Sequence, residues 1–218
     1  MLIKDLLKAR ARKAQLTRMG RILTELMKRG INTKQLQALE LFANSGESHV
    51  KDYAPWVSTL EMWEIDPAYE KMLKQSFPLA KVKITDSYEE IKSTHKKYDL
   101  IIVDNGTSIY GGHCEHFDLF PDIFRVAADS SILILNVIPE ADHAALKEFP
   151  YLFHQAQLVK RQDFYKTTHP EKISVDEMLK VYKELIDRNG FGLEWHFLQK
   201  RSFVYYLVLK IRKLEFNS

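Results

Sequence analysis

From residue 36 onward, short apolar runs alternate with stretches in which apolar residues recur every three or four positions. A short apolar run favours a strand, whereas the three-to-four spacing favours a helix packed on one face. The expected strands are residues 37–43, 58–66, 80–86, 98–104 and 130–139. The expected helices between them are residues 46–57, 67–78, 87–97 and 116–127. Strands that alternate with helices are typical of a parallel sheet with helices on both faces.

The C-terminal part of the chain breaks this alternation. Residues 174–191 have helical periodicity and close on Asn189-Gly190, a pair that commonly ends a helix. Two strands follow at 193–201 and 202–213 with almost no connection, so we expect them to pair as a hairpin. The pattern therefore predicts an α/β fold with seven strands, of which the last two are antiparallel.

Two segments stand outside this pattern. Residues 1–35 are expected to form a basic helical extension before a domain at 36–218, because the first 30 residues contain nine Lys or Arg against two acids. Such an arm can contact nucleic acid or another anionic surface, or it can be a packed helix with a solvated cationic face. Residues 140–172 fit no unit of the alternation. We expect this insertion to cover a substrate at the carboxyl ends of the strands, where open α/β sheets bind ligands.

Composition narrows the class of protein. Hydrophobic residues make up 45% and charged residues 28%, which allows both a core and a charged surface. The longest apolar runs are too short to cross a bilayer, and charged residues interrupt the first ten positions, unlike a signal peptide. The single cysteine, Cys114, cannot form an internal disulfide. We expect a cytoplasmic protein with no membrane partner.

The stretch "ELFANSG" at residues 40–46 resembles the first-strand motif of class I S-adenosylmethionine-dependent methyltransferases. The resemblance implies a Rossmann-like, doubly wound, mostly parallel sheet and a cofactor site that includes Glu40, Phe42, Asn44 and Gly46. Asn44 occupies a family glycine position, and asparagine is the ordinary residue that best adopts a left-handed conformation. Glu40 is expected to meet the amino-acid part of the cofactor; the alternative is a buried carboxylate that caps neighbouring amides.

Two further acids follow the second and third strands. Glu64 stands 18 residues after Gly46, close to the spacing of an acid that binds ribose hydroxyls in a nucleoside-binding βαβ unit. Asp66 is the alternative for this role, and Ile65 offers the adenine an apolar surface.

The resemblance also implies that the acid matching Asp86 contacts the adenine amino group. Ser87, the next residue, is part of the same predicted cofactor site. Asp86 could instead cap the following helix, as Ser87 could.

Asp104 ends the fourth strand in "IIVDNG", where a side chain can reach both cofactor and substrate. Methyl transfer needs positioning of the acceptor, and a base if the nucleophile carries a proton. We predict that Asp104 orients or deprotonates the acceptor; the alternative is that it ties down its own loop.

The loop after Asp104, "NGTSIYGGHCEHFD", contains two candidate bases near neutral pH, His113 and His116. Gly111 and Gly112 between them and the strand suggest a hinge or a close backbone approach. No second cluster of metal ligands accompanies "HCEH", so we expect no metal site.

The sequence thus predicts an S-adenosylmethionine-dependent methyltransferase that acts on an O or N nucleophile. The acceptor is expected to be a small molecule, or RNA bound through the basic N-terminal helix. The segment "YDLIIVDNGTS" is also similar to spermidine synthases, which transfer an aminopropyl group. A third alternative is a methyltransferase fold without activity, which serves as a binding or scaffold protein.

Overall fold

A computed structural model describes residues 17–105, 109–110 and 112–215, and the chain divides into two compact units, residues 1–87 and 88–218. Three parallel strands of the first unit lie in the order β3-β2-β1. They are β1 (Gln37–Glu40), β2 (Thr59–Glu64) and β3 (Lys81–Ile84). Four strands of the second unit lie in the order β4-β7-β9-β8. They are β4 (Tyr98–Val103), β7 (Ala127–Val137), β8 (Phe191–Lys200) and β9 (Tyr205–Lys213). The prediction of a seven-stranded, mostly parallel α/β sheet is confirmed.

The helices of the first unit are shorter than the sequence predicts. They are α2 (Arg18–Lys28), α3 (Val50–Tyr53), α4 (Glu70–Ser76) and the 3₁₀ turns η1 (Thr33–Gln35), η2 (Ala54–Trp56) and η3 (Pro67–Tyr69). The expected helix at 46–57 is divided into α3 and η2, and Pro55 lies at the start of η2. Proline has no N–H to continue an α-helical ladder, which explains the division.

Helix α2 packs on this unit through one apolar face. Thr17 caps it by accepting a hydrogen bond from the Gly20 amide at 3.0 Å. Met19, Ile22, Leu23 and Leu26 are buried, and α2 contacts α3. Within residues 18–28 the arm is therefore a packed helix. The first 16 residues of the expected basic arm lie outside the described residues, and its separation from the rest at residue 35 stays a prediction.

The second unit ends in the hairpin that the sequence predicts. Strands β8 and β9 pair antiparallel from Lys200–Tyr205 to Phe191–Lys213, and β9 also pairs antiparallel with β7. Helix α9 (Val175–Arg188) precedes the hairpin and begins with a capping box between Ser174 and Glu177. It ends before Gly190, whose φ of +77° is the left-handed conformation expected of a helix stop.

The remaining elements of this unit are short. Helix α5 (Ser87–Ser93) begins at its boundary and α6 (Phe120–Val126) precedes β7. An unpredicted two-stranded ribbon, β5 (Ile109–Tyr110) with β6 (His113–Cys114), lies in the loop after β4.

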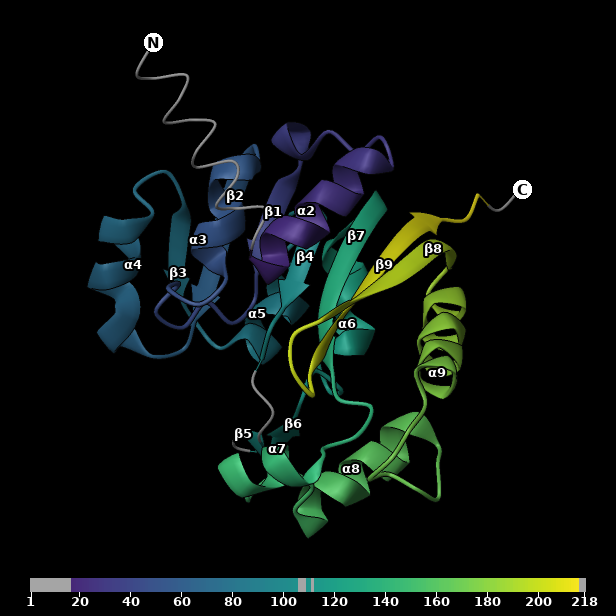
Figure 1. The fold of residues 1–218 in the computed structure, drawn as a ribbon. Coiled ribbons are helices and arrows are strands. Elements are labelled where there is room, and N and C mark those ends of the chain that lie inside the picture. The colour runs from purple at the N-terminus through teal and green to yellow at the C-terminus, as the bar shows by residue number, and fades with distance from the viewer. Residues whose placement is uncertain (1–16, 106–108, 111, 216–218) are drawn as a thin grey trace. The chain divides into compact units, whose positions relative to one another are not determined.

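The expected insertion forms α7 (His143–Glu148) and α8 (Gln155–Tyr165) directly after β7, and Figure 1 shows both at one end of this unit near β5 and β6. Ile138, Ala145, Leu152 and Val204 form a small core that joins the insertion to the end of β7 and to the hairpin. That the insertion covers a substrate stays a prediction. No helix in the described ranges has the length and apolar character needed to cross a membrane.

Candidate active site

The turn after β1 has the conformation that the motif requires. Asn44 has a φ of +49° and Gly46 a φ of +72°, so both are left-handed, as predicted for Asn44. The Gly46 amide donates to the Ala43 carbonyl at 2.9 Å and closes the turn. A Cβ at Gly46 would lie 2.4 Å from the Phe77 ring. Both the left-handed backbone and the close packing therefore favour glycine at position 46.

Glu64 links this turn to the end of β2. Its carboxylate is buried; Oε2 accepts the Asn44 amide at 2.6 Å and Oε1 accepts the Asp66 amide at 2.8 Å. The Asp66 carboxylate is instead used at the start of η3, where it accepts the Ala68 amide at 2.9 Å. Ile65 is 45% exposed between them. Of the two acids considered for the ribose, Glu64 is the one in contact with the turn.

Glu40 is a fully buried carboxylate with internal partners. Oε2 accepts the Tyr53 hydroxyl at 2.8 Å and lies 2.9 Å from Nε2 of His49, while the Phe42 amide is 3.4 Å from Oε1. The carboxylate thus contacts the side chains of Tyr53 and His49 as well as a neighbouring amide, and its contact with the amino-acid part of the cofactor stays a prediction. His49 and Tyr53 were missed from sequence, although a buried acid in a strand requires such donors.

Ser87 and Asp86 lie at the end of β3 and the start of α5. Ser87 is the first residue of α5 and not the residue before it, and its buried hydroxyl donates to the Leu41 carbonyl at the start of the turn. Asp86 is half-buried just before the helix. Of the nine predicted cofactor residues, all except Asp104 therefore lie in the first unit.

Asp104 lies in the second unit, directly after β4, and its side chain is only 6% exposed. Nη1 of Arg201 lies 2.9 Å from each carboxylate oxygen, and the Tyr206 hydroxyl donates to Oδ2 at 2.7 Å. Burial alone would lower the pKa of Arg201, but the Asp104 carboxylate and Tyr206 raise it above its ordinary value. Sequence reasoning missed both partners: Arg201 lies in the connection between β8 and β9, and Tyr206 lies in β9.

His113 is half-buried and has two partners. Its ring stacks on Tyr88 with centroids 3.7 Å apart, and Nδ1 lies 2.8 Å from Oδ2 of Asp118. The role of His113 as a base stays a prediction.

His116 is placed in the core, contrary to the expectation of a base open to a substrate. It is fully buried; its Nε2 lies 2.6 Å from the Tyr182 hydroxyl, and aromatic rings surround it. Burial, and secondarily the charge of Arg161, lowers the pKa of His116 from 6.5 to about 3. We therefore do not propose His116 as a base.

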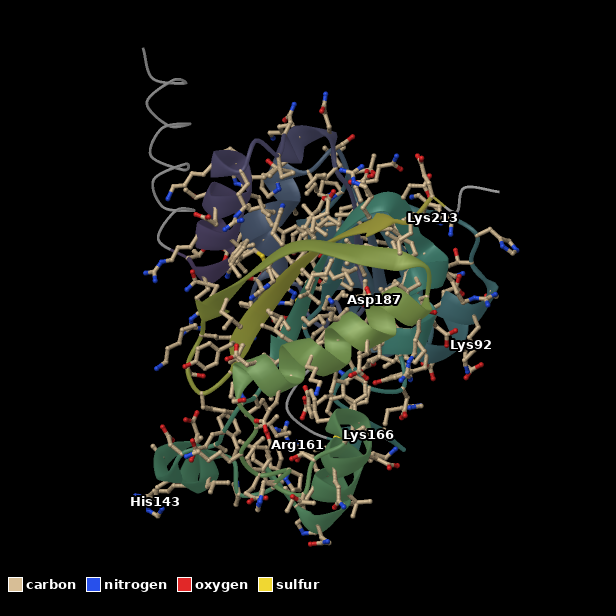
Figure 2. All side chains as sticks on the ribbon, turned by 90° about the vertical axis from the view of Figure 1, so that its right-hand side faces the viewer. Lys92, His143, Arg161, Lys166, Asp187 and Lys213 are labelled. Atoms are coloured by element: carbon tan, nitrogen blue, oxygen red, sulfur yellow. The ribbon has the colours of Figure 1, made fainter. Side chains whose placement is uncertain are left out.

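Arg161 of the insertion makes the most deeply buried ion pair of the second unit. Its Nη1 donates to Oε1 of Glu115 at 2.6 Å, and Nε and Nη2 donate to the carbonyls of Pro170 and Ile138, each at 2.7 Å. Figure 2 shows Arg161 among the side chains of the insertion, whereas His143 projects outward. Arg161 thus anchors α8 to β6 and to the end of β7. Within the described part of the chain, no three His, Cys, Asp or Glu side chains are grouped as metal ligands.

No protein-family model and no curated protein matches the chain. Solved structures share its fold. The magnesium protoporphyrin IX methyltransferase of Synechocystis with bound S-adenosylhomocysteine is 13% identical, with a TM-score of 0.56 over 95% of this chain and 87% of that one. A proposed sarcosine dimethylglycine methyltransferase of Galdieria sulphuraria is 15% identical, with a TM-score of 0.57 over 93% and 88%. A proposed RNA methyltransferase of Pyrococcus horikoshii is 11% identical, with a TM-score of 0.55 over 90% and 83%. The chain has the fold of class I S-adenosylmethionine-dependent methyltransferases.

Proposed function

We propose that the chain is an S-adenosylmethionine-dependent methyltransferase that acts on an O or N nucleophile. The observation that supports this most directly is the contact between Glu64 and the left-handed turn at Asn44 and Gly46. It brings an acid at the end of the second strand to the glycine turn after the first strand, which is the arrangement of a nucleoside-binding βαβ unit.

The residues present fit the cofactor. Each carboxylate oxygen has two lone-pair sites, so Glu64 accepts one backbone N–H at each oxygen and keeps capacity for two ribose hydroxyls. The exposed side chain of Ile65 offers an apolar surface for an adenine ring. Glu40 holds α3 against β1 through Tyr53 and His49. We propose that these contacts fix the conformation of the turn that follows β1.

S-adenosylmethionine, when bound, supplies a methyl group on a positively charged sulfur. The protein itself must position the acceptor and receive its proton. We propose that Asp104 has this role. Arg201 and Tyr206 hold its carboxylate in one orientation, which favours a role as an orienting hydrogen-bond acceptor.

Two kinds of acceptor are considered. A small molecule covered by residues 140–172 is favoured, because Arg161 fixes the insertion at the end of β7 in the unit that contains Asp104. RNA is the alternative, supported by the basic first 30 residues. If RNA is the acceptor, RNA affinity should fall steeply with salt and be lost when residues 1–16 are deleted, since phosphate contacts release counterions.

Calorimetry with S-adenosylmethionine and S-adenosylhomocysteine tests the proposal. We expect both to bind, and failure of both at millimolar concentration would contradict it. A transfer assay that compares S-adenosylmethionine with its decarboxylated form separates methyl transfer from aminopropyl transfer, because activity with only the decarboxylated donor would favour the latter.

A further inference from the structure

A connected group of polar side chains surrounds Asp104 in the second unit. This Asp104 cluster consists of Asp104, Asn105, Asn136, Arg201 and Tyr206. Asn136 pairs with Tyr206 in the ladder between β7 and β9, and its Nδ2 donates to the Asn105 carbonyl. Arg201 and Tyr206 both bind Asp104. The five residues therefore form one site built from β4, β7 and the C-terminal hairpin.

Arg201 uses only one of its three nitrogens in this cluster. Nη1 contacts both oxygens of Asp104 and lies 3.1 Å from the Tyr206 hydroxyl. Nε and Nη2 have no hydrogen-bond partner among the residues that the structure describes. These two nitrogens form the edge of a guanidinium that binds a carboxylate or phosphate through two parallel hydrogen bonds. The Arg201 side chain is 31% exposed, so a ligand can reach it.

Two buried amide oxygens in the cluster need a hydrogen-bond donor, whereas the nitrogens of Arg201 need an acceptor. Asn136 is only 4% exposed, and the hydrogen bond from its Nδ2 fixes which way its amide points. Oδ1 of Asn136 and Oδ1 of Asn105 are both buried and have no partner among the described residues. Because buried acceptors in native proteins are nearly always satisfied, these two atoms are available to a hydrogen-bond donor of a ligand.

We propose that the Asp104 cluster binds the methyl acceptor, and that this acceptor is a small molecule with both an oxyanion and a hydrogen-bond donor. The proposal rests on the proposed function. The carboxylate or phosphate of the acceptor pairs with Nε and Nη2 of Arg201, while its N–H or O–H group donates to Asn136 and Asn105. Since Arg201 and Asp104 already neutralise each other, a ligand with an ammonium beside a carboxylate adds no net charge to this partly buried site, and an ammonium beside a phosphate offsets part of the phosphate charge. Amino acids and amino phosphates have this chemistry.

Nitrogen-15 NMR titration of the full chain tests the proposal without catalysis. The four probes are glycine, O-phosphoethanolamine, acetate and methylamine at constant ionic strength, and the Nε–H signal of Arg201 is the reporter. We expect glycine or O-phosphoethanolamine to bind at least about tenfold more tightly than acetate or methylamine, because only the first two fill both halves of the site. The tighter of the two identifies the oxyanion as carboxylate or phosphate. If no probe shifts the signal, or if acetate binds as tightly as glycine, the proposal is wrong.

Two variants test the assignment to residues. Arg201→Lys removes the reporter signal, so probe affinity is compared by calorimetry in the wild type and in the variants. This substitution keeps the charge beside Asp104 but loses the two-nitrogen edge, and it should weaken binding of the better probe at least about tenfold. Asn136→Leu should weaken it as well. Arg212→Lys is the matched control, because Arg212 lies on β9 and is paired with Glu194 through Nε; its probe affinity should equal that of the wild type. Unchanged affinity in Arg201→Lys would overturn the proposal.

Calorimetry with S-adenosylmethionine on the same samples separates the two proposals. Binding of the cofactor without binding of any probe overturns only the acceptor site. Binding of a probe without binding of the cofactor overturns the proposed function and leaves the oxyanion site in place.

Discussion

Two buried acids of the first unit are held differently from two buried acids of the second. In the first unit, Glu64 accepts backbone amides from residues 20 and two positions away, and Glu40 contacts a hydroxyl and a histidine 13 and nine positions away. In the second unit, Asp104 and Glu115 are each bound by an arginine, 97 and 46 positions away. The first arrangement shapes a turn locally. The second ties distant segments together through charge, and the two should respond differently when a partner is removed.

The largest effect is expected at Asp104. If it orients or deprotonates the acceptor, Asp104→Asn should lower turnover by roughly 10²–10⁴-fold, the range of general acid–base contributions. Cofactor binding, assigned to the first unit, should persist. Turnover is measured by release of S-adenosylhomocysteine, with an acceptor identified by untargeted methylation profiling. Turnover that survives Asp104→Asn but collapses in His113→Ala would move the base to the histidine loop.

Removal of Arg161 should cause the largest loss of stability. Arg161→Met leaves the Glu115 carboxylate buried without its cation, which typically costs about 3–5 kcal/mol. Denaturant unfolding measures the change. The double variant Arg161→Met with Glu115→Gln should recover a substantial part of the lost stability. Arg188→Met, at an exposed pair with Glu184, should change the free energy of unfolding little. A loss below about 1 kcal/mol for Arg161→Met would show that charge does not hold these segments together.

His116 should make the second unit sensitive to acid. Its pKa is lowered from 6.5 to about 3, so the folded state takes up this proton less readily than the unfolded state. The free energy of unfolding therefore keeps its full value with respect to this group above pH 6.5, and it falls by up to about 5 kcal/mol as the pH falls toward 3. Burial raises the pKa of Glu115, which acts in the opposite direction, but this term cancels when variants are compared.

Denaturant unfolding between pH 7 and pH 4 measures that dependence. His116→Leu should show a smaller decline in stability than the wild type. Equal declines in both proteins would mean that His116 is not the source.

In the first unit, the local contacts of Glu64 predict a moderate effect on ligand binding. Glu64→Ala should weaken S-adenosylmethionine binding by about 1.5–3 kcal/mol, the value of hydrogen bonds to a charged group. Asp66→Ala should weaken it less, because Asp66 caps η3. Calorimetry compares the two, and the reverse order would assign the ribose to Asp66.

The smallest effect is expected at Tyr53. Tyr53→Phe removes one donor from Glu40 while His49 remains, so the free energy of unfolding should fall by only about 1 kcal/mol. Denaturant unfolding measures this, and Tyr69→Phe, at a half-buried position of η3, is the control. A loss as large as that of Arg161→Met would remove the contrast between the two units.

The parts of the molecule that were predictable from the sequence are those set by local patterns. The seven strands follow from apolar runs, the helix stop from Asn189-Gly190, and the left-handed turn from Asn44 and Gly46. The partners of Asp104 were not predictable, because no periodicity connects position 104 to Arg201 and Tyr206. The burial of His116 was missed for the same reason, since two of the rings around it, Phe164 and Tyr182, come from α8 and α9.

The separation of Asp104 and Arg201 in the chain also bears on how the protein is made. A ribosome adds about 5–20 residues per second, so the 97 positions between them take roughly 5 to 20 s to synthesise. During that interval the nascent chain already contains every residue of the turn in the first unit, while Asp104 has not yet met its cation. Translation thus completes the Asp104 cluster last, and a message that ends before the C-terminal hairpin would produce the turn without it.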